Sequence, residues 1–339
     1  MSINRYRPLA QTGPARPNGA RQLAGGPVWF THAALHRRGE VVRIVAAEEI
    51  PEPALGALTA RRAPICGLTF ERPRLMGVLN VTPDSFSDGG RFLRREDAVA
   101  RARAMLEAGA DMIDIGGEST RPGADDVPAE VEAGRVVPVI AALREAGIEA
   151  PISVDTRKAS VAAEAFAAGA GLFNDVSALG FDPASLGLAA ARGWPVCLMH
   201  AQGDPRTMQI APHYDDVLLD VCDFLEARMA AAEAAGIPRE RILLDPGIGF
   251  GKTVAHNLAL VRGLSMLHGL GAAVLFGASR KRFIGTIGGA DRPEARLPGS
   301  IAVALEALRQ GVQVIRVHDV AETRQAMALW TALNGDGRD

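Results

Sequence analysis

Eight short apolar runs alternate with alanine-rich amphipathic stretches from Leu75 onward, and this repeat is the strongest restriction on the fold. The runs are LMGVLNV (75–81), DMIDIG (111–116), PISVD (151–155), GLFND (171–175), WPVCLMH (194–200), RILLDPG (241–247), AAVLFG (272–277) and VQVIRVH (312–318). Stretches such as REDAVARARAMLEAGA have the apolar spacing and the final glycine typical of helices. A last helix is expected near residues 321–333. The alternation therefore predicts eight β–α units.

Eight such units over residues 73–335 match the size and strand count of a (β/α)8 TIM barrel in the α/β class. A doubly wound sheet is the competing fold, but it would more often have fewer strands and a glycine-rich turn after the first one. The runs are apolar throughout, as expected of parallel strands that are covered on both faces. Residues 1–72 are richer in Pro, Gly and Arg and are expected to form an accessory segment, with a possible hairpin in VWFTHAALHRRGEVVRIVAA.

Composition excludes several functional classes. The chain has 339 residues, 48% of them hydrophobic, and a net charge of −2, which gives no sign of a nucleic-acid or membrane-surface partner. The first residues lack the apolar stretch of a signal peptide, and no run reaches the length of a membrane span. The three cysteines, Cys66, Cys197 and Cys222, have neither metal-ligand spacing nor an even count for disulfides. We expect a cytoplasmic protein with reduced thiols, and Cys197 in the core.

Polar residues occur where the predicted strands end. They are Asn80, Asp114 within the second run, Asp155, Asn174, Asp175, His200, Asp245, Arg316, His318 and Asp319. In a TIM barrel these ends form one rim, where the chemistry takes place. A single buried aspartate is usually a hydrogen-bonded core residue or a helix cap, but that explanation does not suit a polar group at the end of nearly every strand. The pattern predicts a binding site at this rim.

An anion site is expected at the loops after the last two strands, where barrels often bind phosphate. These loops hold Ser279, Arg280, Lys281, Arg282, Arg316 and His318, and LPGS (297–300) could open a helix with free N–H groups. Of the cations, we expect Lys281, Arg316 and His318 to face a ligand and the others to be solvated.

Asp155 and Asp245 form a second group, because neither has a cation beside it in the sequence. Such a pair could bind a metal or accept hydrogen bonds from a heterocycle with adjacent N–H donors. Asn80 and Asn174 would add neutral, orienting hydrogen bonds. The structural alternatives are a cap on the helix near residue 158 for Asp155, and a turn-stabilising role before Pro-Gly for Asp245.

The first two loops at the rim, NVTPDSFSDGGRF (80–92) and GGESTRPGA (116–124), are long and polar. Long loops of this kind are often lids. Pro83 and Phe86 could cover a ring, and Thr120 and Arg121 could reach into the site. The alternative is that both are disordered surface loops.

The segment LLDPGIGFGKT (243–253) looks like a nucleotide-binding loop because it ends in Gly-Lys-Thr. A Walker A motif also needs a glycine five positions before its last glycine, and Pro246 stands there. Proline offers no N–H to a phosphate, which argues against an ATPase. The segment is instead expected to be the loop after the sixth strand.

Seven ordered motifs resemble those of the dihydropteroate synthase family. They are LMGVLNVTPDSFSDGG, DIGGESTRPGA, SVDTRKA, FNDVSAL, LLDPGIGFGK, SRKRFIG and RVHDV, and they cover nearly everything from residue 74 onward. The resemblance implies a TIM barrel that joins 6-hydroxymethyl-7,8-dihydropterin pyrophosphate to 4-aminobenzoate, giving 7,8-dihydropteroate and pyrophosphate in folate synthesis. It also implies a homodimer and Mg²⁺ as cofactor.

The resemblance assigns roles residue by residue. It implies that the pterin pyrophosphate meets Thr120, Asp155, Asn174, Asp245, Lys281, Arg316 and His318. Of these, Asp155, Lys281 and Thr120, together with Arg121, would be catalytic. Mg²⁺ would lie near Asn80, and 4-aminobenzoate near Pro83, Phe86 and Ser279.

Two rival functions stay open at this point. A methyltetrahydrofolate-type methyltransferase would share the pterin-facing Asp and Asn residues, but would need neither the two loops nor the anion site. A non-catalytic pterin-binding subunit would be expected to have degraded loops, whereas every motif position is present here. The segment 1–72 is longer than the hairpin that many family members carry, and its role is not legible.

Overall fold

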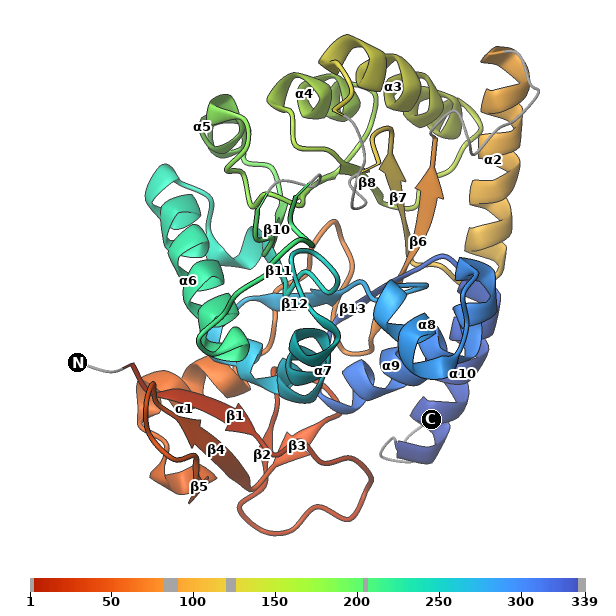
Figure 1. The fold of residues 1–339 in the computed structure, drawn as a ribbon. Coiled ribbons are helices and arrows are strands. Elements are labelled where there is room, and N and C mark those ends of the chain that lie inside the picture. The colour runs from red at the N-terminus through yellow and green to blue at the C-terminus, as the bar shows by residue number, and fades with distance from the viewer. Residues whose placement is uncertain (1–2, 82–90, 120–125, 204–206, 335–339) are drawn as a thin grey trace.

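The computed structural model describes residues 3–81, 91–119, 126–203 and 207–334. Eight parallel strands close into a barrel in chain order, with β13 pairing back to β6 through Ile315 opposite Leu75. The strands are β6 (Arg74–Asn80), β7 (Met112–Gly116), β8 (Ile152–Asp155), β9 (Leu172–Asp175), β10 (Val196–Met199), β11 (Ile242–Asp245), β12 (Ala273–Phe276) and β13 (Val314–Val317). The eight predicted runs and the TIM barrel are confirmed, and the open doubly wound sheet is wrong (Figure 1).

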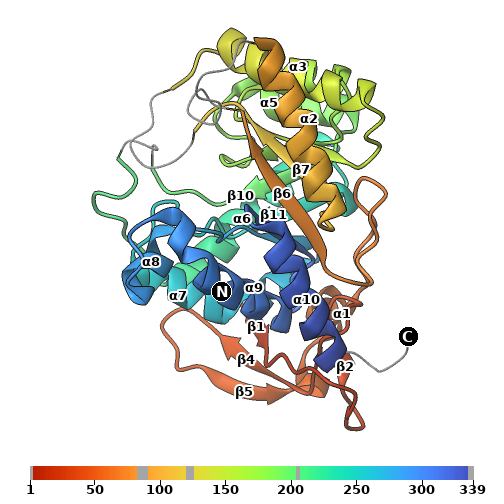
Figure 2. The ribbon, with the colours of Figure 1, turned by 90° about the vertical axis from the view of Figure 1, so that its right-hand side faces the viewer.

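Helices surround the barrel, as Figures 1 and 2 show. They are α2 (Arg91–Glu107), α3 (Ala129–Glu145), α4 (Ala159–Ala167), α5 (Pro183–Arg192), α6 (Val217–Ala235), α7 (Val254–Gly263), α8 (Arg282–Gly288), α9 (Leu297–Arg309) and α10 (Val320–Asn334). The last helix lies where the sequence predicts it. No helix in the described ranges combines the length and apolarity that a membrane crossing requires.

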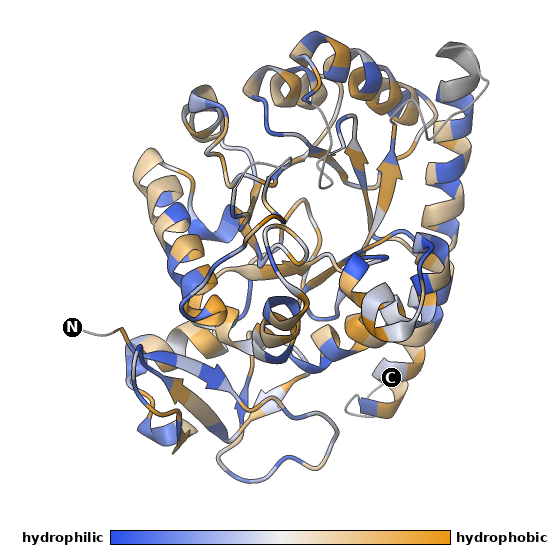
Figure 3. Cartoon of the chain, in the orientation of Figure 1, coloured by the Kyte–Doolittle hydropathy of each residue, from blue (hydrophilic) through white to orange (hydrophobic). Residues whose placement is uncertain are grey.

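Apolar side chains fill both faces of the strands, which explains why the runs lack alternation. Inside the barrel lie Met76, Met112, Leu172, Cys197, Leu243, Leu275 and Val314. Their strand neighbours, such as Leu75, Ile113 and Leu198, pack outward beneath the helices. Figure 3 shows hydrophobic colour along the strands and mixed colour on the helices. Cys197 is fully buried, as expected of a core residue.

The amino-terminal segment forms a small sheet at the lower edge of the barrel in Figure 1. Strands β1 (Arg5–Pro8), β4 (His32–His36) and β5 (Arg43–Ala46) make an antiparallel sheet in the order β1-β4-β5. The expected hairpin corresponds to β4 and β5. A two-stranded ribbon, β2 (Arg21–Gln22) and β3 (Trp29–Phe30), and helix α1 (Glu52–Thr59) complete the segment.

The segment also closes one end of the barrel. Ile65 and Phe70 pack with the side chains inside the barrel, so packing continues across the expected boundary at residue 72. The buried Arg62 donates hydrogen bonds to the carbonyls of Ala57, Ala60 and His268. These carbonyls come from α1, from the residue after it and from the 3₁₀ helix Leu264–Leu270, so one guanidinium ties the segment to the barrel.

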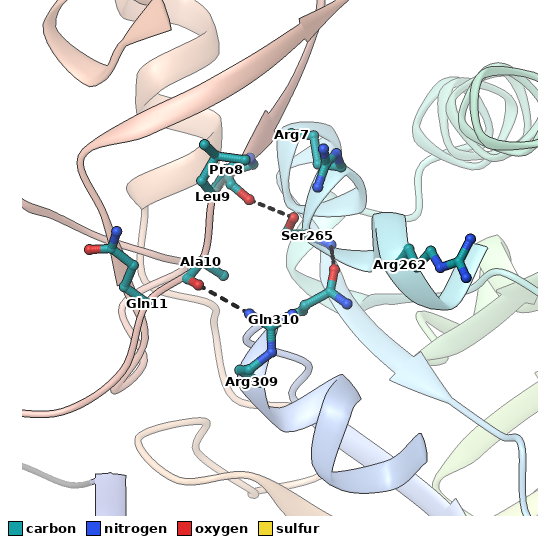
Figure 4. A pocket seen from close by; sticks show the side chains of 9 residues that line it. All are labelled: Arg7, Pro8, Leu9, Ala10, Gln11, Arg262, Ser265, Arg309 and Gln310. Carbon is teal, nitrogen blue, oxygen red and sulfur yellow. Dashed lines mark hydrogen bonds between the residues drawn. The ribbon is translucent and has the colours of Figure 1, made fainter. Parts of the chain in front are cut away.

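Figure 4 shows the seam between β1 and the barrel. The Ser265 hydroxyl donates to the Pro8 carbonyl at 2.8 Å, and Arg309 donates to the Ala10 carbonyl at 3.4 Å. A pocket of about 210 Å³ lies between these groups. In this view the Arg262 guanidinium points away from the other labelled residues. The seam contains none of the site residues that the sequence predicts.

Candidate active site

The carboxyl ends of the strands bring the predicted polar residues to one mouth of the barrel. Asp155 ends β8, Asp245 ends β11, and Asn174 lies near the end of β9. Asp155 lies opposite Asn174 in the register of the two strands. Because all the strands of a TIM barrel run in the same direction, these ends share one rim.

Arg316 connects the two sides of this mouth. From β13, its Nη2 contacts Asp114 at 2.6 Å and Asp155 at 2.8 Å, and its Nε donates to Asp114 at 2.6 Å. The Asn174 amide lies 3.3 Å from both Asp114 carboxylate oxygens. Asp114 is completely buried, and within the described part of the chain these contacts compensate its charge. The result is a fixed network of one cation, two carboxylates and one amide.

The surroundings of Asp155 raise the pKa of its carboxyl group. Burial raises its pKa to about 7, against the opposing effect of the Arg316 charge, and the Asp114 carboxylate raises it further. The alternative role of Asp155 as a helix cap is wrong, because Asp182 accepts the N–H of Ala159 at the start of α4. Asp155 is therefore available to the mouth.

Asp245 has the turn-stabilising role that the sequence offered as an alternative. Its Oδ1 accepts the N–H of Gly247 at 2.7 Å, which stabilises the turn through Pro246. Burial raises the pKa of Asp245 to about 6, while the Gly247 hydrogen bond and the charge of Lys281 oppose the shift. The second carboxylate oxygen faces the β12 side, since a methyl group added at Gly277 would lie 3.7 Å from it and 3.7 Å from Arg316 Cβ. Asp245 and Arg316 are thus neighbours at the same mouth.

Lys281 lies beside this pair. It immediately precedes α8, and its Nζ is 4.1 Å from the centre of the Phe250 ring. The Gly249 backbone lies against its side chain, because an added Cβ at Gly249 would be 3.2 Å from Lys281 Cδ. The loop after β11 therefore shapes the position of this lysine.

His318 and Ser279 form the neighbouring part of the site, in the loops after β13 and β12. The Ser279 hydroxyl oxygen lies 3.0 Å from His318 Nδ1 and accepts the His318 backbone N–H at 3.2 Å. Of the other cations expected here, Arg280 pairs with Asp319, its Nε donating at 3.0 Å, and Arg282 is exposed. The expectation that both are solvated thus holds for Arg282 and not for Arg280, which is partly buried and paired.

Asn80, the predicted metal neighbour, is half-buried at the end of β6. Within the described ranges, no cluster of three or more His, Cys, Asp or Glu residues could enclose a metal ion. Mg²⁺ usually keeps several waters and binds through one or two carboxylates together with substrate phosphates, so the Asn80 amide oxygen could add only one hard donor to an ion held by a diphosphate.

Four predicted site residues, Pro83, Phe86, Thr120 and Arg121, lie outside the described residues. The second loop is nevertheless tied at its base. Glu118 accepts the N–H of Val127 at 2.9 Å, and Arg157 donates to Glu118 at 3.1 Å and to Asp126 at 2.9 Å. These contacts join residues on both sides of the segment 120–125.

The sequence places Asp114 among the polar residues of the rim but predicts no role for it in binding or catalysis. The signal was present, because a carboxylate inside the apolar run DMIDIG must have a partner when it is buried. Its partner, however, is distant in the sequence. Lys252 was judged only as a failed phosphate ligand, and the structure buries it beneath the loop after β11.

Comparison with known proteins agrees with this geometry. The model of the pterin binding enzyme family matches residues 76–318. The dihydropteroate synthase of Escherichia coli (strain K12) is 49% identical over 260 residues, which are 77% of this chain and 91% of that protein. The enzyme of Haemophilus influenzae is 47% identical over 266 residues, 78% of this chain and 95% of that protein.

Solved structures of dihydropteroate synthases are also similar to this chain. Xanthomonas albilineans dihydropteroate synthase with 4-aminobenzoic acid is 51% identical with a TM-score of 0.75, covering 80% of this chain and 97% of that one. The same enzyme in complex with 7,8-dihydropteroate is 48% identical with a TM-score of 0.72, covering 80% and 98%. The family match, the sequence identities and the barrel mouth agree, and the chain belongs to the dihydropteroate synthases, transferases of the pterin-binding family.

Proposed function

We propose that the mouth of this barrel joins 6-hydroxymethyl-7,8-dihydropterin pyrophosphate to 4-aminobenzoate, with the pterin held by Asp155, Asn174, Asp245 and Lys281. The observation that carries the proposal is the shared mouth in which Arg316 contacts Asp155 and adjoins Asp245. A pterin presents a 2-amino group and a ring N–H side by side, and a carboxylate accepts such a pair as it does from arginine. Asp245 suits this edge because one of its oxygens is already oriented by Gly247.

The diphosphate of the substrate would be bound by Arg316 and His318. Arg316 uses Nε and Nη2 on the two carboxylates, and Nη1 makes no hydrogen bond to a described residue. A guanidinium has five N–H donors, so Nη1 can donate to a phosphate without breaking the network. His318 lies beside Ser279, which we place near the 4-aminobenzoate carboxylate.

Mg²⁺ would be held near Asn80 together with diphosphate oxygens. When bound, the ion takes up negative charge of the leaving diphosphate. The residues of the two loops keep the roles that the sequence motifs imply: Pro83 and Phe86 would cover the aminobenzoate ring, Thr120 would meet the pterin pyrophosphate, and Thr120 and Arg121 would be catalytic. Closed loops would exclude water from the reacting carbon.

The reaction then proceeds by departure of the leaving group first. The C–O bond to the diphosphate breaks and its electron pair leaves with the diphosphate, where Arg316 and His318 stabilise the charge. The remaining allylic cation is conjugated with the pterin ring and is stabilised by the Asp155 carboxylate. The aminobenzoate nitrogen attacks this carbon, the C–N bond forms, and the ammonium nitrogen releases a proton to the departed diphosphate.

A direct assay tests the function. The purified protein is mixed with the pterin pyrophosphate, Mg²⁺ and radiolabelled 4-aminobenzoate, and labelled dihydropteroate is the expected product. Absence of label transfer would overturn the proposed reaction, and transfer of a methyl group from methyltetrahydrofolate would favour the rival methyltransferase.

The affinity for the pterin is expected to depend on pH through Asp245. Its pKa of about 6 means that the carboxylate is ionised above that pH and protonated below it, and a protonated carboxyl accepts hydrogen bonds poorly. The KM for the pterin pyrophosphate should therefore rise as the pH falls through about 6. Because the diphosphate and Asp155, whose pKa is raised to about 7, also titrate, D245N serves as the reference, with a high KM that changes less over the same range. Equal pH profiles for both proteins would contradict this role of Asp245.

We also propose a homodimer in the cytoplasm. Leu329 and Leu333 on α10 are 63% and 72% exposed, which makes this helix face suitable for a second copy. The three cysteines are free, as expected in a reducing compartment. Light scattering coupled to size exclusion would give twice the chain mass, and L329E/L333E would give the monomer mass.

A further inference from the structure

Lys252, the lysine of the Gly-Lys-Thr sequence, turns inward. Only 3% of its surface is exposed. Its Nζ donates to the carbonyls of Gly247 at 2.9 Å and Phe250 at 3.0 Å, and lies 2.9 Å from Nδ1 of His200. Burial and the Lys252 charge lower the pKa of His200 to about 3, so this imidazole is neutral and Nδ1 accepts. Burial lowers the pKa of Lys252 to about 7, and the charge of Asp245 opposes that shift. In the ammonium form its three donors face four acceptors, the fourth being the His200 carbonyl at 3.4 Å.

The loop from Asp245 to Lys252 is folded around this ammonium. Gly247 has φ +66°, and an added Cβ would lie 1.8 Å from the carbonyl oxygen of His200. Gly251 has φ +62°, and its Cβ would lie 2.4 Å from the Gln202 carbonyl oxygen. A phosphate-binding loop directs N–H groups at an anion, whereas this loop directs carbonyls at an internal cation.

Gly247 and Phe250, whose carbonyls accept from Lys252, each also contact a residue of the proposed pterin site. The N–H of Gly247 orients Asp245 Oδ1 at 2.7 Å. The ring of Phe250 lies 4.1 Å from Lys281 Nζ. A shift of the loop would therefore move a carboxylate and an ammonium together.

We infer that Lys252 is a positioning residue, which holds the loop after β11 in the shape that places Asp245 and Lys281 against the pterin. The inference rests on the proposed role of Asp245 and Lys281 in pterin binding. Lys252 is assigned an indirect role because its side chain is buried and its Nζ contacts the Gly247 and Phe250 carbonyls and His200.

The test is Lys252→Met, which keeps a long apolar stem and removes the three donors. The KM for the pterin pyrophosphate should rise about tenfold, the scale seen when an outer support of a binding site is lost. The KM for 4-aminobenzoate at saturating pterin should stay within about twofold of wild type. Binding of the pterin pyrophosphate with Mg²⁺, measured by calorimetry without aminobenzoate, should weaken by the same factor. If K252M does not fold, K252Q, which keeps a donor for one carbonyl, is measured instead.

Arg62→Met is the matched control. Arg62 is also a buried cation that donates to three carbonyls, but it lies at the closed end of the barrel. The variant R62M should lower the unfolding midpoint, as K252M does, and leave the KM values for the pterin pyrophosphate and for 4-aminobenzoate unchanged. Equal pterin affinity in K252M and wild type, or an equal loss in R62M, would overturn the inference.

Phe250→Leu tests the connection to Lys281 separately. It removes the ring and leaves the Phe250 carbonyl for Lys252, so the pterin KM should rise by a smaller factor. In the double variant K252M/F250L, the pterin KM should rise by less than the product of the two single-variant factors, because both residues act through the same loop. Fully multiplicative losses would contradict that coupling. A wild-type protein that makes no dihydropteroate would overturn the proposed function, a result separate from all of these.

Discussion

Arg316→Met is expected to lower kcat/KM about a thousandfold and to reduce the free energy of unfolding by about 3 kcal/mol. The variant removes the donors proposed for the diphosphate. It also leaves the carboxylates of Asp114 and Asp155 close together without the guanidinium that joins them. Steady-state kinetics and urea unfolding measure the two effects.

Two further variants separate charge pairing from catalysis. R316M/D114N should recover part of the lost stability but none of the activity, because it removes the buried uncompensated charge and not the need for a cation. Arg280→Met is the control for a guanidinium in the next loop, since Arg280 pairs with Asp319. A loss of activity in R280M as large as in R316M would show that the anion site has been placed wrongly.

Asp155→Asn is expected to lower kcat about a hundredfold at saturating pterin pyrophosphate. The amide keeps the size and some hydrogen bonding of the side chain, but it loses the negative charge next to the allylic cation. The effect should therefore appear in kcat measured at saturation, beyond any rise in KM. Wild-type turnover at saturating pterin would end the idea that Asp155 acts beyond binding.

Asp175→Asn is the matched control on the adjacent strand. Asp175 is fully buried, whereas Asp155 is partly exposed, and it accepts hydrogen bonds from the backbone N–H groups of Ser177 and Leu179 and from the Ser177 hydroxyl. These bonds stabilise the turn after β9 instead of facing the network of Arg316. D175N should lower the unfolding midpoint and leave kcat within about twofold of wild type.

The strands were predictable because their signal is local. Each apolar run is short, lacks alternation and is followed by a helix pattern, which is what a parallel strand covered on both faces requires. The position of Asp155 and Asp245 at the mouth followed directly, since both end such runs. The boundary predicted at residue 72 does not separate two cores, because Ile65 and Phe70, which precede it, pack with the side chains inside the barrel.

Lys252 shows why the rest was not predictable. The sequence excluded the phosphate-binding loop through Pro246, yet it contained no sign of where the lysine would turn. That direction depends on the carbonyls of Gly247 and Phe250 and on His200, which reaches the loop from a different strand. Cation and acceptors meet only after β10 and β11 have paired.

The sequence by itself determined the barrel, the end of the barrel that carries the chemistry and the family, because local periodicity and motif order do not depend on long-range contacts. The tertiary structure decided which polar groups pair. Arg316 and Asp114 are separated by 202 positions and meet only because β13 closes against β6. Their burial makes that pairing obligatory, since a carboxylate removed from water is stable only beside a cation or hydrogen-bond donors.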